Sequence, residues 1–319
     1  MLVDVPAAVL DEVRTANDKL EALLASIAPV HQVPAAVTRQ ARSEGKGLWG
    51  PIVRSDKAVT RVIPGPAGPV PLRVVVPDRD PDAVYLHIHG GGWTLGSAEE
   101  HDPLLEALAA QAGVAVVSAD YRLAPEHPFP AGPDDCEAAA VWLLGAAASE
   151  FGTDRLLIGG ESAGAHLSVS TLLRVRDRHD ALDRFAGANL VFGAYDLSGT
   201  PSTRRWGERN LVLSTPIVEW FTENFLPGLS PEQRRRPDIS PLYASLQGMP
   251  PALFTVGMLD PLLDDSLFMA ARWEAAGSPA TLRVYPEGPH AFHAFPTALG
   301  RMSVEEQTRF IADWAGGDH

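Results

Sequence analysis

The amino-acid sequence predicts an α/β fold in which a mostly parallel sheet is covered by helices on both faces. Short apolar runs alternate with segments of helical periodicity from about residue 58 onward, and this alternation is typical of parallel sheets. Several runs are apolar at nearly every position, as in strands that are buried on both faces. With 319 residues, of which 45% are hydrophobic and 21% charged, the chain has an ordinary globular composition and can bury a sizeable core.

Strands and helices follow one another along the chain in a regular order. Apolar residues at helical spacing predict a first helix over residues 7–27, with a start near Pro6 and a stop at Pro29. Strands at 58–63 and 70–76 flank a turn rich in proline and glycine, so we expect them to pair. The later strands are expected at 83–89, 114–119, 155–159, 189–195, 252–257 and 281–285, and the helices at 103–112, 133–144, 163–176, 261–276 and 303–314.

Two segments, 1–45 and 198–240, do not fit the alternation of strands and helices. A long insertion between sheet elements is usually a lid or a functional loop. We therefore interpret residues 1–45 and the irregular insertion at about 198–240 as a helical cap, and residues 46–319 as the α/β domain that carries the insertion. Surface decoration is the alternative interpretation. The aromatic residues that we expect to line the pocket under the cap and to contact the substrate are Trp93, Trp206, Trp220 and Phe225.

Charge and cysteine content exclude several classes of partner. The net charge is −14, and an acidic protein lacks the basic surface that nucleic acid or an anionic membrane requires. The densest basic cluster, Arg234 to Arg236, is short. No apolar run approaches the roughly 18 residues of a membrane span, and the N-terminus does not resemble a signal peptide. The single cysteine, Cys136, permits no intrachain disulfide and is expected to be a core residue, so we expect a cytoplasmic protein without stable membrane association.

The segment Gly160-Glu161-Ser162-Ala163-Gly164 follows an expected strand and precedes an expected helix. This is the strand–turn–helix context that a G-x-S-x-G nucleophile elbow requires. The serine must project from a tight turn, and side chains two positions to either side would collide with the neighbouring strand and helix. We therefore predict that Ser162 is a nucleophile, against the alternative of an inert serine in a glycine-rich turn.

The segment His89-Gly90-Gly91-Gly92-Trp93 follows the strand expected at 83–89. Consecutive glycines leave main-chain N–H groups open, and such groups can stabilise an oxyanion without reorganising. The spacing matches neither of the common phosphate-binding glycine patterns. His87 and His89 form a His-x-His pair, but no third ligand is evident nearby in the sequence, so we expect no metal site.

A base and an acid are expected after Ser162. His290 follows the last strand and Asp260 follows the strand before it, so both should lie at carboxyl ends of neighbouring strands. The order Ser162, Asp260, His290 is the order of α/β hydrolases. His293 is an alternative base and Asp196 an alternative acid. Three further candidates are expected to have structural roles: His166 in the packing of a helix on the sheet, and Asp264 and Asp265 at a helix start.

Taken together, these motifs resemble the bacterial hormone-sensitive-lipase family, family IV, of α/β-hydrolase carboxylesterases. The resemblance covers about residue 58 to the C-terminus, while residues 1–45 match only in general character. The stretches that carry it are 89–93, 120–131, 160–164, 260–262 and 290–292. Glu161 stands where many members have Asp or Thr, and Ala291 where most have glycine, so the effect of Glu161 on substrate preference is open. Within 120–131 we expect Arg122 to pair with Glu126 and to hold a rigid, proline-rich loop.

The resemblance implies that the main-chain N–H groups of Gly91, Gly92 and Ala163 form the oxyanion hole. It also implies a serine carboxylesterase that hydrolyses short- to medium-chain acyl esters through an acyl-enzyme, with no cofactor and no metal. An amidase, deacetylase or lactone hydrolase with the same triad is the alternative, and a non-catalytic small-molecule receptor on the same fold is a weaker one. The partner is then a small ester, and the open edge of the last strand offers a surface through which a homodimer can form.

Overall fold

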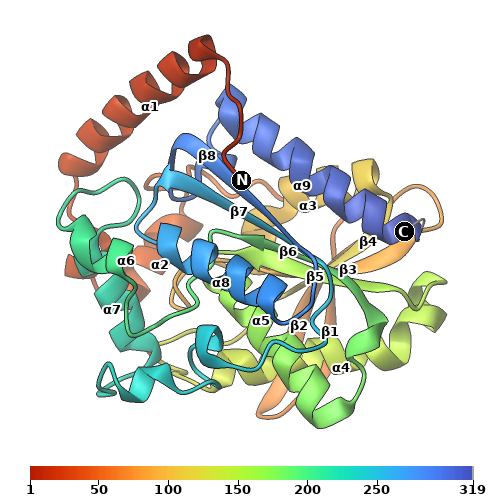
Figure 1. The fold of residues 1–319 in the computed structure, drawn as a ribbon. Helices are drawn as coiled ribbons and strands as arrows, with labels where there is room; N and C mark the ends of the chain where they lie inside the picture. Colours follow the sequence, from red (N-terminus) through yellow and green to blue (C-terminus); the bar gives the residue numbers. More distant parts are fainter. Residues whose placement is uncertain (318–319) are drawn as a thin grey trace.

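The computed structural model describes residues 1–317 and is built around one twisted sheet (Figure 1). The sheet has eight strands in the order β1-β2-β4-β3-β5-β6-β7-β8. β1 and β2 form an antiparallel hairpin, β2 is antiparallel to β4, and the remaining neighbours are parallel. The strands are β1 Val59–Gly65, β2 Gly68–Val75, β3 Ala83–Ile88, β4 Val114–Ala119, β5 Leu156–Glu161, β6 Phe185–Val191, β7 Ala252–Leu259 and β8 Ala280–Pro289. The expected parallel α/β sheet is therefore confirmed.

Helices cover both faces of the sheet, as expected. On one face, α3 (Asp102–Ala112) and α9 (Ala298–Gly316) pack against each other and on the central strands. On the other face lie α4 (Ala131–Phe151), α5 (Ala163–Arg174) and α8 (Leu263–Ala275), and a single turn of π-helix, Val175–His179, continues α5 (Figure 1).

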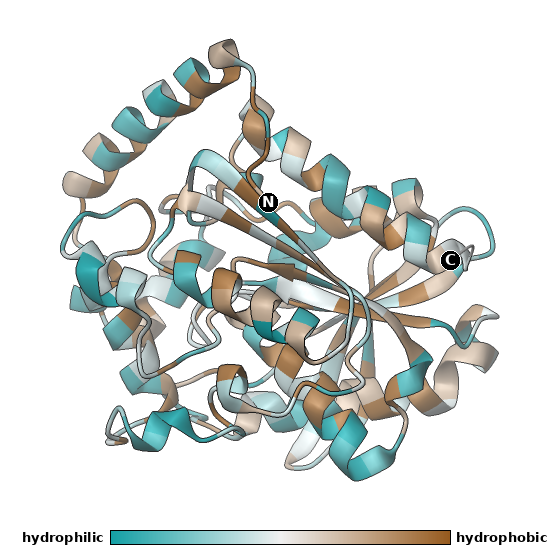
Figure 2. Ribbon diagram, in the orientation of Figure 1, coloured by the Kyte–Doolittle hydropathy of each residue, from teal (hydrophilic) through white to brown (hydrophobic). Residues whose placement is uncertain are grey.

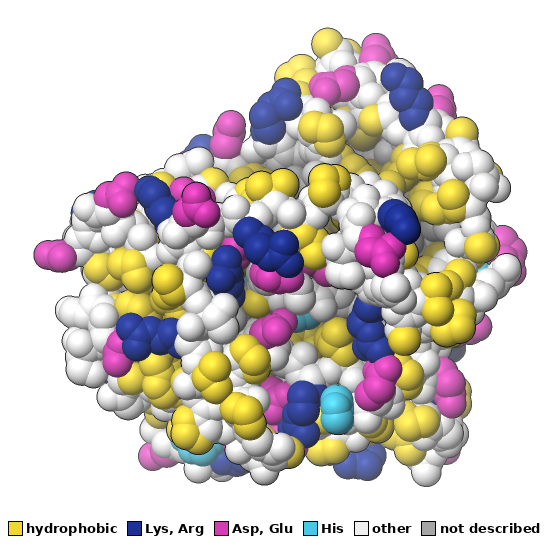
Figure 3. Space-filling model, turned by 180° about the vertical axis from the view of Figure 1, so that it is seen from behind, with side chains coloured by type: hydrophobic (Ala, Val, Ile, Leu, Met, Phe, Trp, Pro, Cys, Tyr) yellow, Lys and Arg dark blue, Asp and Glu magenta, His cyan; other side chains and the backbone are white. Residues whose placement is uncertain are grey.

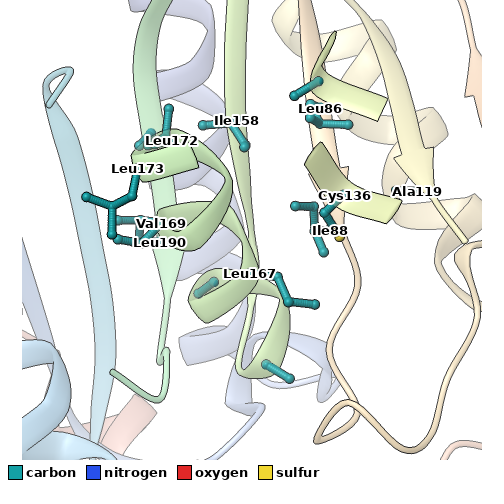
Figure 4. Close-up of a cluster of buried hydrophobic side chains, with 14 of the residues drawn as sticks. Leu86, Ile88, Ala119, Cys136, Ile158, Leu167, Val169, Leu172, Leu173 and Leu190 are labelled. Atoms are coloured by element: carbon teal, nitrogen blue, oxygen red, sulfur yellow. The ribbon is translucent and has the colours of Figure 1, made fainter. Parts of the chain in front are cut away.

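The core forms where α5 packs on the buried strands. Strands such as β3 and β4 are buried at every position and are predominantly hydrophobic (Figure 2). Side chains of α5 such as Leu167 and Leu172 lie against Ile158 of β5 and neighbouring strands (Figure 4). Cys136 of α4 is fully buried in the same cluster, which confirms its expected place in the core.

Several boundaries differ from the sequence expectation, among them the carboxyl end of β8 and the start of α9. β6 is Phe185–Val191, so the strand expected at 189–195 begins four residues earlier and ends earlier. The apolar run continues past its end, and at Phe192 the backbone turns to a φ of 36°. The insertion expected to be irregular contains two helices, α6 Pro201–Trp206 and α7 Thr215–Phe225. α4 is longer at both ends than the helix expected at 133–144.

The N-terminal segment lies at the carboxyl ends of the last strands. It contains α1 (Ala7–Ala25) and α2 (Ala35–Ser43), and α1 extends beyond the body of the molecule with one polar face (Figures 1 and 2). Leu20 and Leu24 of α1 pack on Leu211 of the insertion, and Glu21 pairs with Arg209 at 3.0 Å. The two segments outside the alternation therefore contact one another, and their action as a cap stays a prediction.

The first residues of the chain run along the outer edge of β8. The N–H of Val3 donates to the carbonyl of Val284 at 2.9 Å, and the N–H of Val284 donates to the carbonyl of Met1 at 2.8 Å. Leu2 and Val284 form a parallel bridge. This part of the edge is thus already paired within one chain.

The expected ion pair between Arg122 and Glu126 is wrong. Arg122 instead binds the buried carboxylate of Asp135 through two guanidinium nitrogens, at 2.8 and 2.9 Å. Glu126 pairs with Arg39 of α2. Asp135 lies beyond the start of α4, and Arg39 lies far away in the sequence. The two ion pairs attach the 120–131 loop to α4 and to α2.

The surface carries basic and acidic side chains interspersed on the face seen in Figure 3. Most arginines of the described residues have an acidic partner within 4.0 Å, among them Arg234 with Glu223 and Arg236 with Asp238. Within residues 1–317, no helix is both long enough and apolar enough to cross a bilayer.

Candidate active site

Ser162 occupies a strained turn between β5 and α5. Its φ is 57° and its ψ is −119°, a conformation that non-glycine residues rarely adopt. The N–H of Ser162 donates to the carbonyl of Val191 on β6 at 2.8 Å, which fixes the turn on the neighbouring strand. The serine is partly exposed, whereas Glu161 and Ala163 beside it are buried. The turn therefore presents the hydroxyl above the sheet.

Glycines on both sides make this turn possible. A Cβ added at Gly160 would lie 2.0 Å from the carbonyl oxygen of Ile88, and one at Gly164 would lie 1.8 Å from the same atom. Both distances are too short for any side chain. β3 therefore approaches the elbow so closely that only glycine fits two positions before and two positions after the serine, as the sequence predicted.

Ser162, His290 and Asp260 are joined by hydrogen bonds. Nε2 of His290 lies 3.0 Å from Oγ of Ser162, and Nδ1 of His290 lies 2.8 Å from Oδ2 of Asp260. The other carboxylate oxygen of Asp260 accepts the N–H of Leu262 at 2.8 Å. Asp260 and His290 are almost completely buried, and the ring of Phe192 packs edge-on against the imidazole with centroids 4.7 Å apart. The three residues follow β5, β7 and β8, so the topology brings them to one end of the sheet.

The alternative acid and base candidates have other partners. Asp196 binds the N–H and hydroxyl of Ser198 and the hydroxyl of Tyr243. His166 is fully buried and bridges Trp93 to the carbonyl of Ile239. His293 packs on Phe192, and none of the hydrogen bonds between described residues joins it to Ser162.

Asp264 and Asp265 lie in the first turn of α8, as expected. Asp265 accepts hydrogen bonds from the N–H groups of Tyr195 and Asp196 and from the hydroxyl of Thr200. Asp264 accepts the N–H of Ser202. Both carboxylates thus attach the strand end and the insertion to α8, which is a structural role.

The glycine loop after β3 lies beside the elbow and has open N–H groups. Gly91 and Gly92 have φ values of 111° and 59°, in the region that favours glycine. Among the hydrogen bonds of residues 1–317, none uses the N–H of Gly91, Gly92 or Ala163. A Cβ at Gly92 would lie 2.1 Å from the ring of Phe221 on α7, so the insertion packs directly on this loop.

Glu161 connects the elbow to the glycine loop. One carboxylate oxygen accepts the N–H of Gly90 at 2.7 Å, and the other lies 3.1 Å from Nε2 of His87. Burial acts to raise the pKa of Glu161, but the imidazoles of His101 and His87 lower it by more, so the carboxylate is ionised. The side chain is therefore directed under the loop. Nothing in the local sequence signals this role, because Gly90 and His87 come from another strand.

The predicted aromatic residues fall into two groups. Trp93 and Phe225 are buried and stack on each other with centroids 4.7 Å apart, and the indole N–H of Trp93 donates to His166. This pair attaches α7 to α5 from beneath. Trp206 packs with the leucines of α1, and Trp220 lies beside Phe221 with centroids 4.9 Å apart. Phe221, which contacts the glycine loop, was not among the residues predicted to contact substrate.

A serine on an elbow after a central parallel strand, with a histidine and a carboxylate from strands further along the sheet, defines the class of α/β hydrolases. In agreement, residues 85–294 match a family model described as the alpha/beta hydrolase fold. The chain is 38% identical over 256 residues to the carboxylic ester hydrolase LipN of Mycobacterium tuberculosis, which covers 77% of this chain and 67% of LipN. It is 34% identical over 246 residues to an acetyl-hydrolase of Streptomyces hygroscopicus, which covers 76% of this chain and 79% of that protein.

A solved structure described as a hormone-sensitive lipase from a metagenome library superposes with a TM-score of 0.81 at 30% identity and covers 95% of this chain and 98% of that one. The chain belongs to the hormone-sensitive-lipase-like family of carboxylic ester hydrolases with the α/β-hydrolase fold. The resemblance noted in the sequence is therefore confirmed.

Proposed function

We propose that this protein is a serine carboxylesterase in which Ser162, His290 and Asp260 are the catalytic triad and the substrates are esters with short- to medium-chain acyl groups. The observation that carries the proposal is the continuous chain of hydrogen bonds from Oγ of Ser162 through both ring nitrogens of His290 to Asp260, at 3.0 and 2.8 Å. That chain has the distances that a nucleophile, its base and an orienting acid require.

The reaction follows from these contacts. His290 takes the proton of Ser162 at Nε2 while Oγ attacks the ester carbonyl carbon. Asp260 accepts the Nδ1–H and stabilises the imidazolium, and Leu262 holds that carboxylate in place. The imidazolium then protonates the leaving alcohol. Water attacks the acyl-enzyme with His290 as base, which releases the acid and restores the serine hydroxyl.

The oxyanion is stabilised by the N–H groups of Gly91, Gly92 and Ala163 in this proposal. Their hydrogen-bonding capacity is free, and Ala163 is the first residue of α5, where the helix dipole places partial positive charge. Donors that are already fixed need no reorganisation when charge develops on the carbonyl oxygen. The hole is thus built from the end of β3 and the start of α5.

The contacts of the insertion support a restricted pocket. Phe221 lies on Gly92, and Trp220 lies beside Phe221, so α7 closes one side of the space above the glycine loop. The name of the acetyl-hydrolase relative also favours short acyl groups. We therefore propose that the segments 1–45 and 198–240 act as a cap that limits acyl length.

Two further properties belong to the proposal. A homodimer through the edge of β8 would have to displace Met1 to Val3 from Val284, so we propose that this edge does not form the principal association surface. The only cysteine is buried and no disulfide is needed, which is compatible with a cytoplasmic compartment.

The test combines Ser162→Ala with covalent labelling. The variant should keep its circular dichroism spectrum and melting temperature but lose turnover of aryl esters, and an organophosphonate should label the wild type at Ser162 alone. A chain-length series of aryl esters, measured beside matched acyl amides, should show faster ester hydrolysis and a decline at long chains. Rates should level off below the solubility limit of each ester. Labelling at another serine would contradict the triad, and faster amide hydrolysis would favour an amidase.

A further inference from the structure

Two histidines and a glutamate converge behind the elbow, outside the triad. His87 lies on β3, Glu161 ends β5, and His101 lies on the short turn Ala98–His101 before α3. One ligand atom from each of the three residues lies within 4.8 Å of the others. Nε2 of His87 is 3.1 Å from one oxygen of Glu161, and Nε2 of His101 is 3.5 Å from the other. The sequence pattern showed only His87 and His89, because His101 and Glu161 join the cluster through the fold.

The surroundings orient the His87 imidazole toward this cluster. Nδ1 of His87 lies 2.9 Å from the hydroxyl of Ser118 on the adjacent strand. Without an ion, Nε2–H of His87 donates to the ionised Glu161, and Nδ1 accepts the hydroxyl of Ser118. When an ion replaces the Nε2 proton, Nδ1–H donates to Ser118 instead, and the lone pair of Nε2 is directed at the ion. Metal-binding histidines commonly have such a partner on the other ring nitrogen, which fixes the tautomer.

Access and space are present as well. The His101 side chain is 22% exposed, whereas those of His87 and Glu161 are nearly buried. A cavity of about 50 Å³ adjoins the cluster and is lined by His87 and Glu161 together with the polar residues Asn189 and Gln307. That volume accommodates a water molecule. Nε2 of His87 and Nε2 of His101 already lie 3.1 and 3.5 Å from the carboxylate oxygens of Glu161. These distances are near the separation that metal–ligand bonds of about 2 Å produce between neighbouring ligand atoms.

We propose that His87, His101 and Glu161 form a binding site for a divalent transition-metal ion, for which Zn²⁺ is the best match. Two imidazoles and one carboxylate suit zinc, whereas Mg²⁺ and Ca²⁺ prefer oxygen ligands. A water molecule from the cavity completes a tetrahedral set. The site is separate from the proposed esterase chemistry, which uses no ion.

The same site is connected to the oxyanion loop. The oxygen of Glu161 that faces His101 also accepts the N–H of Gly90. A metal ion that draws on this oxygen weakens that hydrogen bond and releases the start of the glycine loop. Zinc binding therefore lowers ester turnover, and this consequence alone rests on the proposed function.

The binding test uses the full-length protein after inactivation by an organophosphonate, so that Ser162 and His290 are blocked as competing ligands. Isothermal titration with Zn²⁺ near pH 7.5 should show one site. His101→Gln should weaken that site at least about tenfold, since even indirect partners of a metal contribute this much. His179→Gln is the matched control, because His179 also contacts a glutamate, at 2.8 Å, outside the cluster.

Retention of the zinc site in His101→Gln, or its loss in His179→Gln, would overturn the proposal, and so would the absence of binding to the wild type. A second measurement needs no variant: Co²⁺ bound by this set should give the intense visible absorption of tetrahedral coordination, and only weak bands would contradict it. With active enzyme, zinc inhibition should be relieved in His101→Gln. If zinc binds but does not inhibit, the proposed effect on the Gly90 hydrogen bond is wrong, while the zinc site itself stands. If the protein shows no esterase activity, the proposed function is wrong, and the binding measurement still tests the zinc site.

Discussion

The carboxylate of Glu161 accepts a 2.7 Å hydrogen bond from the main-chain N–H of Gly90. The residue before the predicted nucleophile thus holds the first glycine of the predicted oxyanion loop. A hydrogen bond to a charged group is stronger than one between neutral groups. The spacing between Ser162 and the loop therefore depends on a side chain that does not itself contact the reacting atoms.

Glu161→Ala should lower kcat more than it raises KM. Removing the acceptor leaves the buried N–H of Gly90 unpaired, which costs about 1–3 kcal/mol, and the loop can then relax away from its position. We expect kcat to fall about tenfold. Glu161→Gln retains an oxygen acceptor and should recover much of the loss. Equal kcat values for Glu161→Ala and the wild type, in folded protein, would show that the loop is held by other contacts.

Asp260→Asn should reduce turnover on the order of 10⁴-fold, by analogy with other triads, because an amide favours the wrong tautomer of His290. Asp196→Asn is the matched control, since Asp196 binds Ser198 and Tyr243. We expect that variant to stay close to wild-type turnover. Steady-state kinetics with one short aryl ester will measure the turnover of both variants. A larger loss of turnover in Asp196→Asn than in Asp260→Asn would show that Asp196, and not Asp260, is the acid of the triad.

Gly92→Ala should lower kcat/KM about a hundredfold. The backbone φ of 59° disfavours alanine, and the new methyl group would overlap the ring of Phe221. The displaced loop would carry its N–H group away from the oxyanion. Phe221→Ala removes the overlap but not the backbone strain, so the double variant should recover only part of the activity. Full recovery would mean that the contact with Phe221 accounts for the whole effect.

Deleting residues 1–30 should change the preference for acyl chain length more than it changes reaction with a small acyl ester. The deletion removes α1 and uncovers Leu211, so solubility should fall as well. The measurement is the ratio of kcat/KM for long and short aryl esters in deletion variant and wild type. An unaltered ratio in a folded deletion variant would show that the segment is surface decoration.

Acid should destabilise the protein through buried imidazoles such as His166. Burial lowers the pKa of His166 from 6.5 to about 4. Below pH 6.5 the unfolded chain binds a proton that the folded chain rejects until about pH 4, so the free energy of unfolding falls across this interval, by about 3 kcal/mol for this group. Between pH 7 and 4, the free energy of unfolding measured with urea should decline less for His166→Gln than for the wild type, because the glutamine amide can keep both hydrogen bonds but takes up no proton. His179→Gln, on the surface, should leave the decline unchanged.

The alternation of apolar and helical segments was enough to predict the sheet and the helices that cover it. The meeting of Ser162, Asp260 and His290 was predicted from the elbow motif and the order of these residues, together with the rule that strand ends in a parallel sheet lie at one edge. The ends of β6 could not be predicted from the pattern. A buried strand has no alternation of polar and apolar residues, so nothing in the sequence marks that the strand ends before Phe192. The helix α7 was missed although Ser214 and Pro216 mark its start.

Contacts between segments that are distant in the sequence could not be predicted from the sequence pattern. Arg122 was matched with a near neighbour, while its actual partner Asp135 is placed by the packing of α4. The positions of His101 and Glu161 beside His87 likewise depend on three separate elements meeting. Trp93 and Phe225 were predicted to line the substrate pocket, and their mutual stacking inside the core could not be deduced from composition.

The docking of α1 on β8 has a consequence for synthesis on the ribosome. Asn17 donates to the carbonyl of Glu287, so the first helix reaches this partner on β8 only when nearly the whole chain has been translated. At about 5–20 residues per second this takes tens of seconds. Throughout that time Val13, which is buried in the native protein in one cluster with Val284 and Phe292, lacks these native neighbours. The nascent N-terminal helix is therefore a ready target for chaperones that hold exposed apolar segments, and its release must wait for the last strand.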